Sequence, residues 1–83
     1  MTTDTKPPLG AYYEAMGRKL RAARIVAGYD RIVDAADRAG ISESTLGAYE
    51  RGERKPPLPQ LVRLAKAYST TTKALMPDEE PPE

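Results

Sequence analysis

The sequence has 83 residues, which is enough for one small domain of marginal stability. It contains no cysteine and no histidine, which excludes disulfides and thiolate metal sites; with its carboxylates scattered on amphipathic segments, we expect neither an enzyme nor a cofactor. The net charge is only +1, but residues 9–76 carry 12 basic and 7 acidic side chains, a net of +5 that is typical of a polyanion-binding unit, with ordinary surface charge as the alternative.

The two ends of the chain are rich in proline and low in hydrophobicity. We expect residues 1–10 to form a disordered tail, residues 11–76 to form the folded domain, and residues 77–83 to form an acidic, proline-rich tail. No apolar run is long enough to span a membrane, and the N-terminal segment lacks the apolar core of a signal peptide. The expected location is therefore the cytoplasm.

Apolar residues between these tails recur at helical spacing. The first helix is expected at residues 11–27, where Tyr12, Met16 and Leu20 form one stripe before Gly28 ends it.

The next two helices are short and close together. The second is expected at residues 31–39, with Asp30 as its N-cap and small alanines on its inner face, and Gly40 ends it. The third is expected at residues 43–51, with Ser42 as its N-cap. Its inward-facing residues are Leu46 and Tyr49, and Gly52 ends it.

Two further helices complete the pattern. A fourth is expected at residues 58–68, and a last short one at residues 72–76, between Thr71 as its N-cap and Pro77. Five short helices cannot each bury a face alone, so they must pack as one compact all-α bundle. The tight turn between the second and third helices predicts a helix-turn-helix, in which the later helix enters the DNA major groove.

Particular residues connect this pattern to a known family. They are Gly40-Ile41-Ser42, Ser44-Thr45-Leu46, Tyr49-Glu50-Arg51-Gly52, Pro56 and the run Leu61-Val62-Arg63-Leu64-Ala65-Lys66-Ala67-Tyr68. On these residues the chain resembles, from Gly17 to Met76, the lambda-repressor-like (Cro/C1-type, XRE) helix-turn-helix family, and within it actinomycete developmental regulators and small phage repressors. The resemblance implies a sequence-specific regulator of transcription that binds double-stranded DNA, a repressor that acts by occupying an operator.

The resemblance also assigns residues to roles. Arg24 and Glu50 match a salt bridge that joins the first helix to the third, where a guanidinium fits a carboxylate bidentately. At the start of the second helix, where many members carry a DNA-contacting glutamine, this chain has Ile32, and Arg31 beside it is expected to contact a phosphate instead.

Base contacts are expected from the N-terminal turns of the third helix, because only that end reaches the groove floor. Its outward positions are Glu43, Ser44, Gly47 and Ala48, and Thr45 is expected to bond a phosphate or the backbone. The complete set expected at the DNA is Arg31, Ser42, Glu43, Ser44, Thr45, Gly47, Ala48, Arg51, Arg54 and Lys55.

The expected reading helix has no arginine, asparagine or glutamine before Arg51, so bidentate recognition of purines is missing from its tip. Two explanations remain open. Specificity rests on DNA shape and on Arg51, Arg54 and Lys55 at the phosphates or in the minor groove, or the domain binds weakly without a dimer partner.

A homodimer is expected at least on DNA, because two recognition helices about one turn of DNA apart read a palindrome. Its candidate surfaces are Tyr12 and Tyr13, or Tyr68, Leu75 and Met76, and both sets fit the core equally well. The alternative function is a protein-interaction module, antitoxin-like or coactivator-like, that keeps the fold without reading DNA. The regulator interpretation implies association with the nucleoid.

Overall fold

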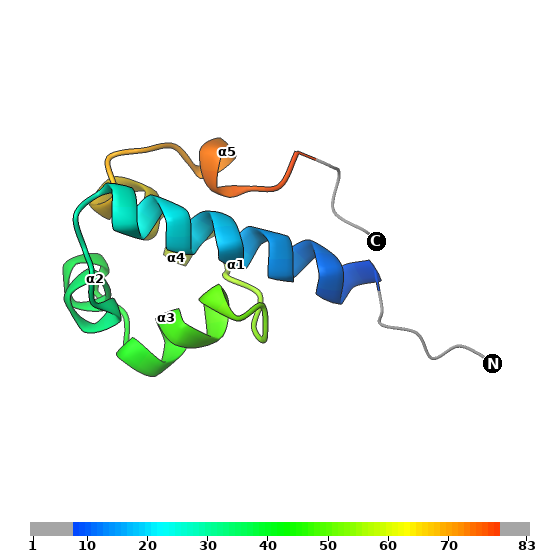
Figure 1. The fold of residues 1–83 in the computed structure, drawn as a ribbon, viewed down its shortest axis with the longest axis horizontal. Coiled ribbons are helices and arrows are strands. Elements are labelled where there is room, and N and C mark those ends of the chain that lie inside the picture. The colour runs from blue at the N-terminus through cyan, green and yellow to red at the C-terminus, as the bar shows by residue number, and fades with distance from the viewer. Residues whose placement is uncertain (1–7, 79–83) are drawn as a thin grey trace.

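The computed structural model describes residues 8–78, which fold into five packed α-helices (Figure 1). The helices are α1 (Pro8–Val26), α2 (Ile32–Ala39), α3 (Glu43–Glu50), α4 (Leu58–Ala67) and α5 (Thr72–Leu75). No strand occurs among the described residues, and the expected all-α bundle is confirmed. None of these helices is long and apolar enough to cross a membrane.

The first helix begins earlier than the sequence indicates. α1 starts at Pro8 rather than Ala11, so residues 8–10 are helical and do not belong to a tail. A proline is tolerated in the first turn because the N–H that it lacks has no intrahelical partner there. The remaining tail residues, 1–7 and 79–83, lie outside the described residues.

The start of α2 also differs from the prediction. Arg31, not Asp30, occupies the N-cap position, and its side chain makes no capping hydrogen bond. The backbone oxygen of Asp30 instead accepts a hydrogen bond of 2.9 Å from Nη1 of Arg24. At the other end, Gly40 adopts a left-handed conformation with φ of 74°, which lets the chain turn directly into α3. The other helix boundaries agree with the prediction to within one residue.

The core lies around α1, which runs across the middle of the molecule with α2 and α3 on one side and α5 on the other (Figure 1). α1 packs against α3 and α5, α2 packs against α3 and α4, and α4 packs against α5. The largest fully buried side chains are Leu20, Leu46, Leu64 and Leu75, one leucine from each helix except α2. Because α2 contributes only small buried alanines, it lies close against its neighbours.

Most of the aromatic residues considered for a dimer surface belong to this core. Tyr12 and Tyr68 are each 5 % exposed, and Leu75 is 1 % exposed. The large apolar side chains that remain exposed are elsewhere, at Ile25, Val26, Leu58 and Val62.

A glycine on α1 sets how closely α1 approaches α3. A Cβ atom added at Gly17 would collide with the backbone carbonyl groups of Tyr49 and Glu50. Only a residue without a side chain therefore allows α1 to lie directly on the last turn of α3. This contact fixes the position of α3 relative to the rest of the molecule.

Candidate nucleic-acid interface

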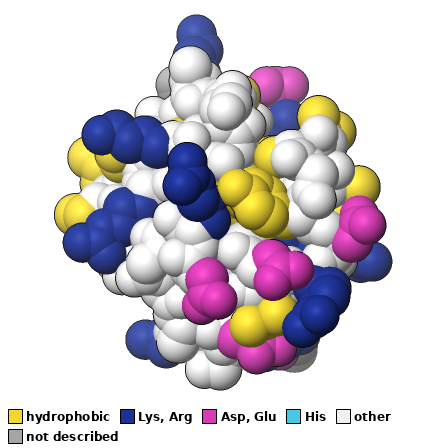
Figure 2. Space-filling model, turned by 90° about the vertical axis from the view of Figure 1, so that its left-hand side faces the viewer, with side chains coloured by type: hydrophobic (Ala, Val, Ile, Leu, Met, Phe, Trp, Pro, Cys, Tyr) yellow, Lys and Arg dark blue, Asp and Glu magenta, His cyan; other side chains and the backbone are white. Residues whose placement is uncertain are grey.

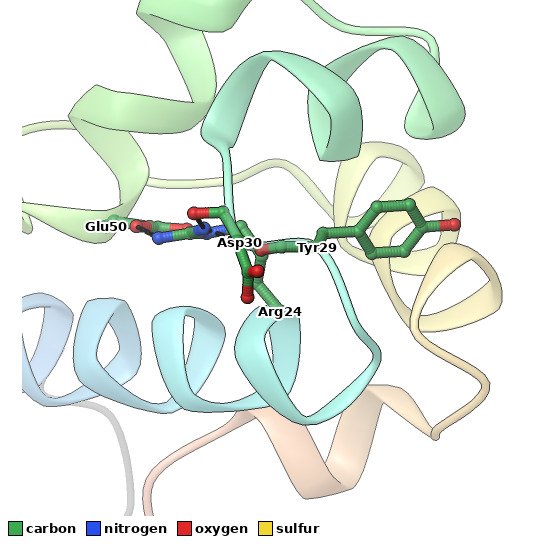
Figure 3. Close-up of polar contacts among 4 residues, drawn as sticks. All are labelled: Arg24, Tyr29, Asp30 and Glu50. Carbon is green, nitrogen blue, oxygen red and sulfur yellow. Dashed lines mark hydrogen bonds and ion pairs between the residues drawn. The ribbon is translucent and has the colours of Figure 1, made fainter.

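A buried ion pair ties the last turn of α3 to α1 (Figure 3). Nε of Arg24 donates to Oε2 of Glu50 at 2.7 Å, and Nη2 donates to Oε1 at 3.3 Å, so the contact is bidentate. The two side chains are 6 % and 7 % exposed. Nη1 of Arg24 also donates to the backbone oxygens of Tyr29, at 2.8 Å, and Asp30, at 2.9 Å. One guanidinium thus joins α1, the loop before α2, and α3.

The N-terminal end of α3 is exposed and well capped. Oγ of Ser42 accepts a hydrogen bond of 3.1 Å from the backbone N–H of Thr45, and donates one of 2.7 Å to Oγ1 of Thr45. Glu43 and Ser44 follow on the surface, and Thr45 is half-buried. The cap orders the first turn of α3, and the acidic Glu43 interacts favourably with the helix dipole there.

Two of the expected outward positions on α3 are not exposed. Ala48 is 7 % exposed and Gly47 is buried as well. Gly47 is covered by Arg51, because a Cβ atom at Gly47 would lie 3.1 Å from Nη1 of Arg51. The expectation that Gly47 and Ala48 are exposed outward positions is wrong. At Gly47 the cover comes from a side chain four residues further along the same face.

A basic turn follows α3. Nε of Arg51 forms an ion pair of 3.1 Å with Oε2 of Glu53, and both side chains are 60 % exposed. Arg54 and Lys55 are exposed, and neither forms an ion pair within residues 8–78. Gly52, with φ of 75°, lies so close to α1 that a Cβ atom there would be 2.7 Å from Cα of Glu14. The turn is therefore held against α1.

Arg31 stands apart from this turn, at the start of α2. Its side chain is 74 % exposed and its Nε lies 4.0 Å from a carboxylate oxygen of Asp34, a weak surface ion pair. Ile32 beside it is half-buried and packs against the core. The isoleucine at this position is thus part of the fold, and the exposed cation beside it is the group available to a phosphate.

The structure also brings together basic residues that sequence reasoning did not single out. Arg38 on α2 lines a shallow groove with Arg63 and Lys66 on α4, and Nη1 of Arg63 donates to the backbone oxygen of Gly40 at 3.5 Å. Figure 2 shows this end of the molecule, where several basic side chains lie on the left of the view and acidic side chains, with further basic ones beside them, lie towards the lower right. The spacing of Arg63 and Lys66, three residues apart on one helix, was the signal in the sequence.

The described residues contain no group of three or more histidine, cysteine, aspartate or glutamate side chains that could hold a metal ion. The polar groups on and after α3 are instead hydroxyls, carboxylates and cations, and the exposed hydroxyls and cations suit hydrogen bonds and charge contacts to a polyanion.

Comparison with known proteins places the chain in a family. The family described as "Helix-turn-helix domain" matches residues 15–77. The HTH-type transcriptional regulator ImmR of Bacillus subtilis (strain 168) is 33 % identical over 66 residues, which are 80 % of this chain and 51 % of that protein. The chain therefore spans about half the length of this curated relative.

Solved structures of similar fold support the same family. The restriction-modification controller protein C.AhdI of Aeromonas hydrophila matches with a TM-score of 0.75 and 29 % identity, over 80 % of this chain and 98 % of that one. The DNA-binding domain of the P22 C2 repressor matches with a TM-score of 0.66 and 28 % identity, over 72 % and 78 % of the two chains. The chain belongs to the helix-turn-helix domain family, in its lambda-repressor-like branch, and its fold and family are those of DNA-binding transcriptional regulators rather than enzymes.

Proposed function

We propose that this protein is a sequence-specific repressor that binds double-stranded DNA with α3 in the major groove and acts by occupying its operator. The proposal is supported above all by the way in which α3 is held at the surface. Its N-terminal end is capped and exposed, and its C-terminal end is fixed by the pair of Arg24 and Glu50. A rigid helix with one free end is what a groove-reading element requires.

The side chains divide into two groups by their chemistry. Glu43 and Ser44 at the exposed end of α3 suit base edges, since a carboxylate accepts from the amino group of cytosine and a hydroxyl bonds several bases. Arg31, Arg54 and Lys55 suit phosphates, because each is an exposed cation outside that end.

Ser42 and Thr45 support the interface in a different way. Their hydroxyls bond to each other, and that of Ser42 also accepts from the α3 backbone, so we assign them to holding the helix end in place, next to a phosphate rather than a base. Gly47 and Ala48 lie on the same helix but are buried. We therefore assign them to the shape of the α3 surface, because small residues here let other groups lie close to the helix.

Equilibrium binding across a salt series tests the DNA-binding part of the proposal. If the basic side chains contact phosphates, the logarithm of the binding constant falls linearly with the logarithm of the salt concentration, by about 0.9 per phosphate contact. An affinity for DNA that does not change with salt would contradict phosphate contacts and favour the protein-interaction alternative.

A reporter gene placed downstream of a site selected by the protein tests the repressor part. We expect the protein to lower transcription when the site overlaps the promoter and to have no effect when the site is scrambled. A rise in transcription from the overlapping site would contradict repression by operator occupancy.

We also propose that the protein acts as a homodimer on a palindromic operator, in the cytoplasm and associated with the nucleoid. The proposal is supported by the presence of exposed apolar side chains on a fold that presents only one reading helix per chain. Analytical ultracentrifugation with and without a palindromic duplex tests it. A strict monomer that binds the palindrome as tightly as a half-site would contradict the dimer. The location is tested separately with a fluorescent fusion, and a fusion that does not follow the nucleoid would contradict it.

A further inference from the structure

The exposed end of α3 lacks the side chains that recognise purines best. Residues 43–50 include no arginine, asparagine or glutamine, although arginine held bidentately on guanine is the commonest specific contact in the major groove. Arg51 follows directly as the C-cap residue and keeps helical backbone angles, with φ of −84° and ψ of −5°. It lies seven residues after Ser44 and four after Gly47, so all three share the outer face of the helix.

The Arg51 side chain runs back along this face. A Cβ atom placed at Gly47 would lie 3.1 Å from Nη1 and 4.0 Å from Nη2 of Arg51, so the guanidinium lies directly over the glycine. Helical side chains point toward the N-terminus of their helix, which is the reading end here. The cation therefore reaches the middle of α3 although its backbone is at the end.

Glu53 pairs with one edge of the guanidinium. The ion pair uses Nε of Arg51, at 3.1 Å from Oε2 of Glu53. Nη1 and Nη2 receive no hydrogen-bond partner from residues 8–78, and the side chain is 60 % exposed. The two terminal nitrogens are thus free to donate together to a planar acceptor pair, such as O6 and N7 of guanine.

This arrangement also explains a glycine in the middle of a short helix. Glycine weakens a helix relative to alanine, and Gly47 has a helical backbone with no need for a positive φ. A larger side chain at this position would occupy the surface on which the guanidinium lies. Gly47 therefore keeps the outer face of α3 open for Arg51.

We propose that Arg51 is a specificity-determining residue that reads a guanine in the major groove from above Gly47. This inference rests on the proposed function, because it assigns the base that the reading helix recognises. It replaces a phosphate contact as the role of Arg51, and it supplies the purine recognition that the tip of α3 lacks.

Selection of bound duplexes from a random library, followed by measured affinities for single-base changes, tests the proposal. We expect a guanine at one fixed position of each half-site. Replacing it costs the wild-type protein roughly 5- to 150-fold in affinity. Arg51→Ala removes both terminal donors, and it should bind all bases at that position within about twofold of one another. Arg54→Ala is the matched control, with the same change in an exposed cation after α3, and should keep the guanine preference.

Modified bases locate the contact in one groove. 7-Deazaguanine at the selected position removes the N7 acceptor from the major groove, and inosine removes only the amino group from the minor groove. The wild-type protein should lose affinity with 7-deazaguanine and not with inosine, and Arg51→Ala should be insensitive to both. Circular dichroism of each variant verifies that the fold is retained, as we expect for a substitution at an exposed residue.

The outcomes separate this inference from the proposed function. A wild-type protein that selects no sequence contradicts sequence-specific binding as a whole, and with it the role of Arg51. A wild-type protein with a clear consensus whose base preferences are unchanged in Arg51→Ala overturns the role of Arg51 alone. A penalty from inosine without one from 7-deazaguanine would also overturn it, because the contact would then lie in the minor groove.

Discussion

Tyr68 places a hydroxyl group inside the core, where residues 8–78 offer it no hydrogen-bond partner. Burial raises the pKa of this hydroxyl far above its ordinary value, and the nearby carboxylate of Glu50 raises it further, while Arg24 acts in the opposite direction. The folded protein therefore keeps this proton at a pH where the unfolded chain loses it. The stability that depends on it is fully present below about pH 10, the unfolded pKa of tyrosine, and decreases above it.

We expect Tyr68→Phe to raise the free energy of unfolding at neutral pH by about 1 kcal/mol, because it removes a buried polar atom that has no partner. It should also reduce the loss of stability above about pH 10. Urea unfolding at neutral and alkaline pH measures both effects. Tyr13→Phe, which removes the same atom from a half-buried tyrosine, is the control. A variant less stable than the wild type at neutral pH would show that the hydroxyl has a partner.

Replacing Arg24 and replacing Glu50 leave different buried groups without a hydrogen-bond partner. Arg24→Leu strands the buried carboxylate and removes two hydrogen bonds to backbone oxygens, so we expect a loss of about 3–5 kcal/mol in the free energy of unfolding. Glu50→Gln keeps an oxygen that can accept from Arg24 and leaves those backbone bonds intact, so its loss should be smaller, about 1–3 kcal/mol. Denaturant unfolding compares the two, and equal losses would contradict the structural role of the backbone bonds.

At the scale of elements, local signals predicted most of the fold. Helical spacing indicated all five helices, and the caps at Ser42 and Thr71 both form as predicted, with hydrogen bonds of 3.1 Å to the third residue after each. The cap expected at Asp30 is absent. The helix begins one residue later, with Arg31 at the N-cap position. The backbone oxygen of Asp30 accepts from the guanidinium of Arg24, six residues earlier, a contact that local spacing could not show.

The candidate site was less predictable than the fold. Its exposed residues, such as Glu43 and Ser44, follow from the helical period, but the covering of Gly47 depends on the path of one long side chain. Helical spacing places Arg51 and Gly47 on one face without showing whether that side chain folds back or extends. In its folded-back path the side chain pairs with Glu53, which lies beyond the end of the helix and outside the helical period.

The contact of α1 with α3 gives a prediction at this scale. We expect Gly17→Ala to lower the free energy of unfolding by about 1–3 kcal/mol or more, because the added methyl group meets backbone atoms of Tyr49 and Glu50 that cannot move aside. Thermal unfolding measures the loss. DNA affinity should fall with it, since α3 would be displaced from α1.

The matched control is the same substitution at the other helical glycine. Gly47→Ala meets only the end of the flexible, exposed Arg51 side chain, so the gain in helix propensity should dominate and raise the free energy of unfolding by about 0.5–1 kcal/mol. If both variants lost stability equally, the difference between a backbone neighbour and a side-chain neighbour would not be the cause.

At the scale of the whole molecule, basic side chains lie on both sides of α1. The reading helix and its basic turn lie on one side of α1, and α5 lies on the other (Figure 1). Lys19 and Lys73 are on the α5 side, where Lys19 lines a shallow groove with Ala74. Two pairs of cations can therefore be compared: Arg54 and Lys55 in the basic turn, and Lys19 and Lys73 on the α5 side. The two pairs carry the same charge at different positions.

We expect Arg54→Gln combined with Lys55→Gln to weaken binding to all DNA sequences and to reduce the salt slope by about 0.9 for each phosphate that the variant no longer binds. Lys19→Gln combined with Lys73→Gln makes the same change in net charge on the α5 side and should leave the slope nearly unchanged. Fluorescence anisotropy across a salt series compares them. Equal effects of the two double variants would show that net charge, rather than the basic turn, controls binding.

The guanidinium of Arg24 has a consequence for the way the molecule opens. It bonds at once to the loop oxygens of Tyr29 and Asp30 and to Glu50 at the end of α3. Neither the loop nor the last turn of α3 can separate from α1 without breaking bonds of the same side chain. The two segments should therefore unfold as one cooperative unit, so that their amide hydrogens exchange with solvent at a common opening free energy. The opening of α3 is thus linked to the opening of the loop that contains Tyr29 and Asp30, although α2 separates the two in the sequence.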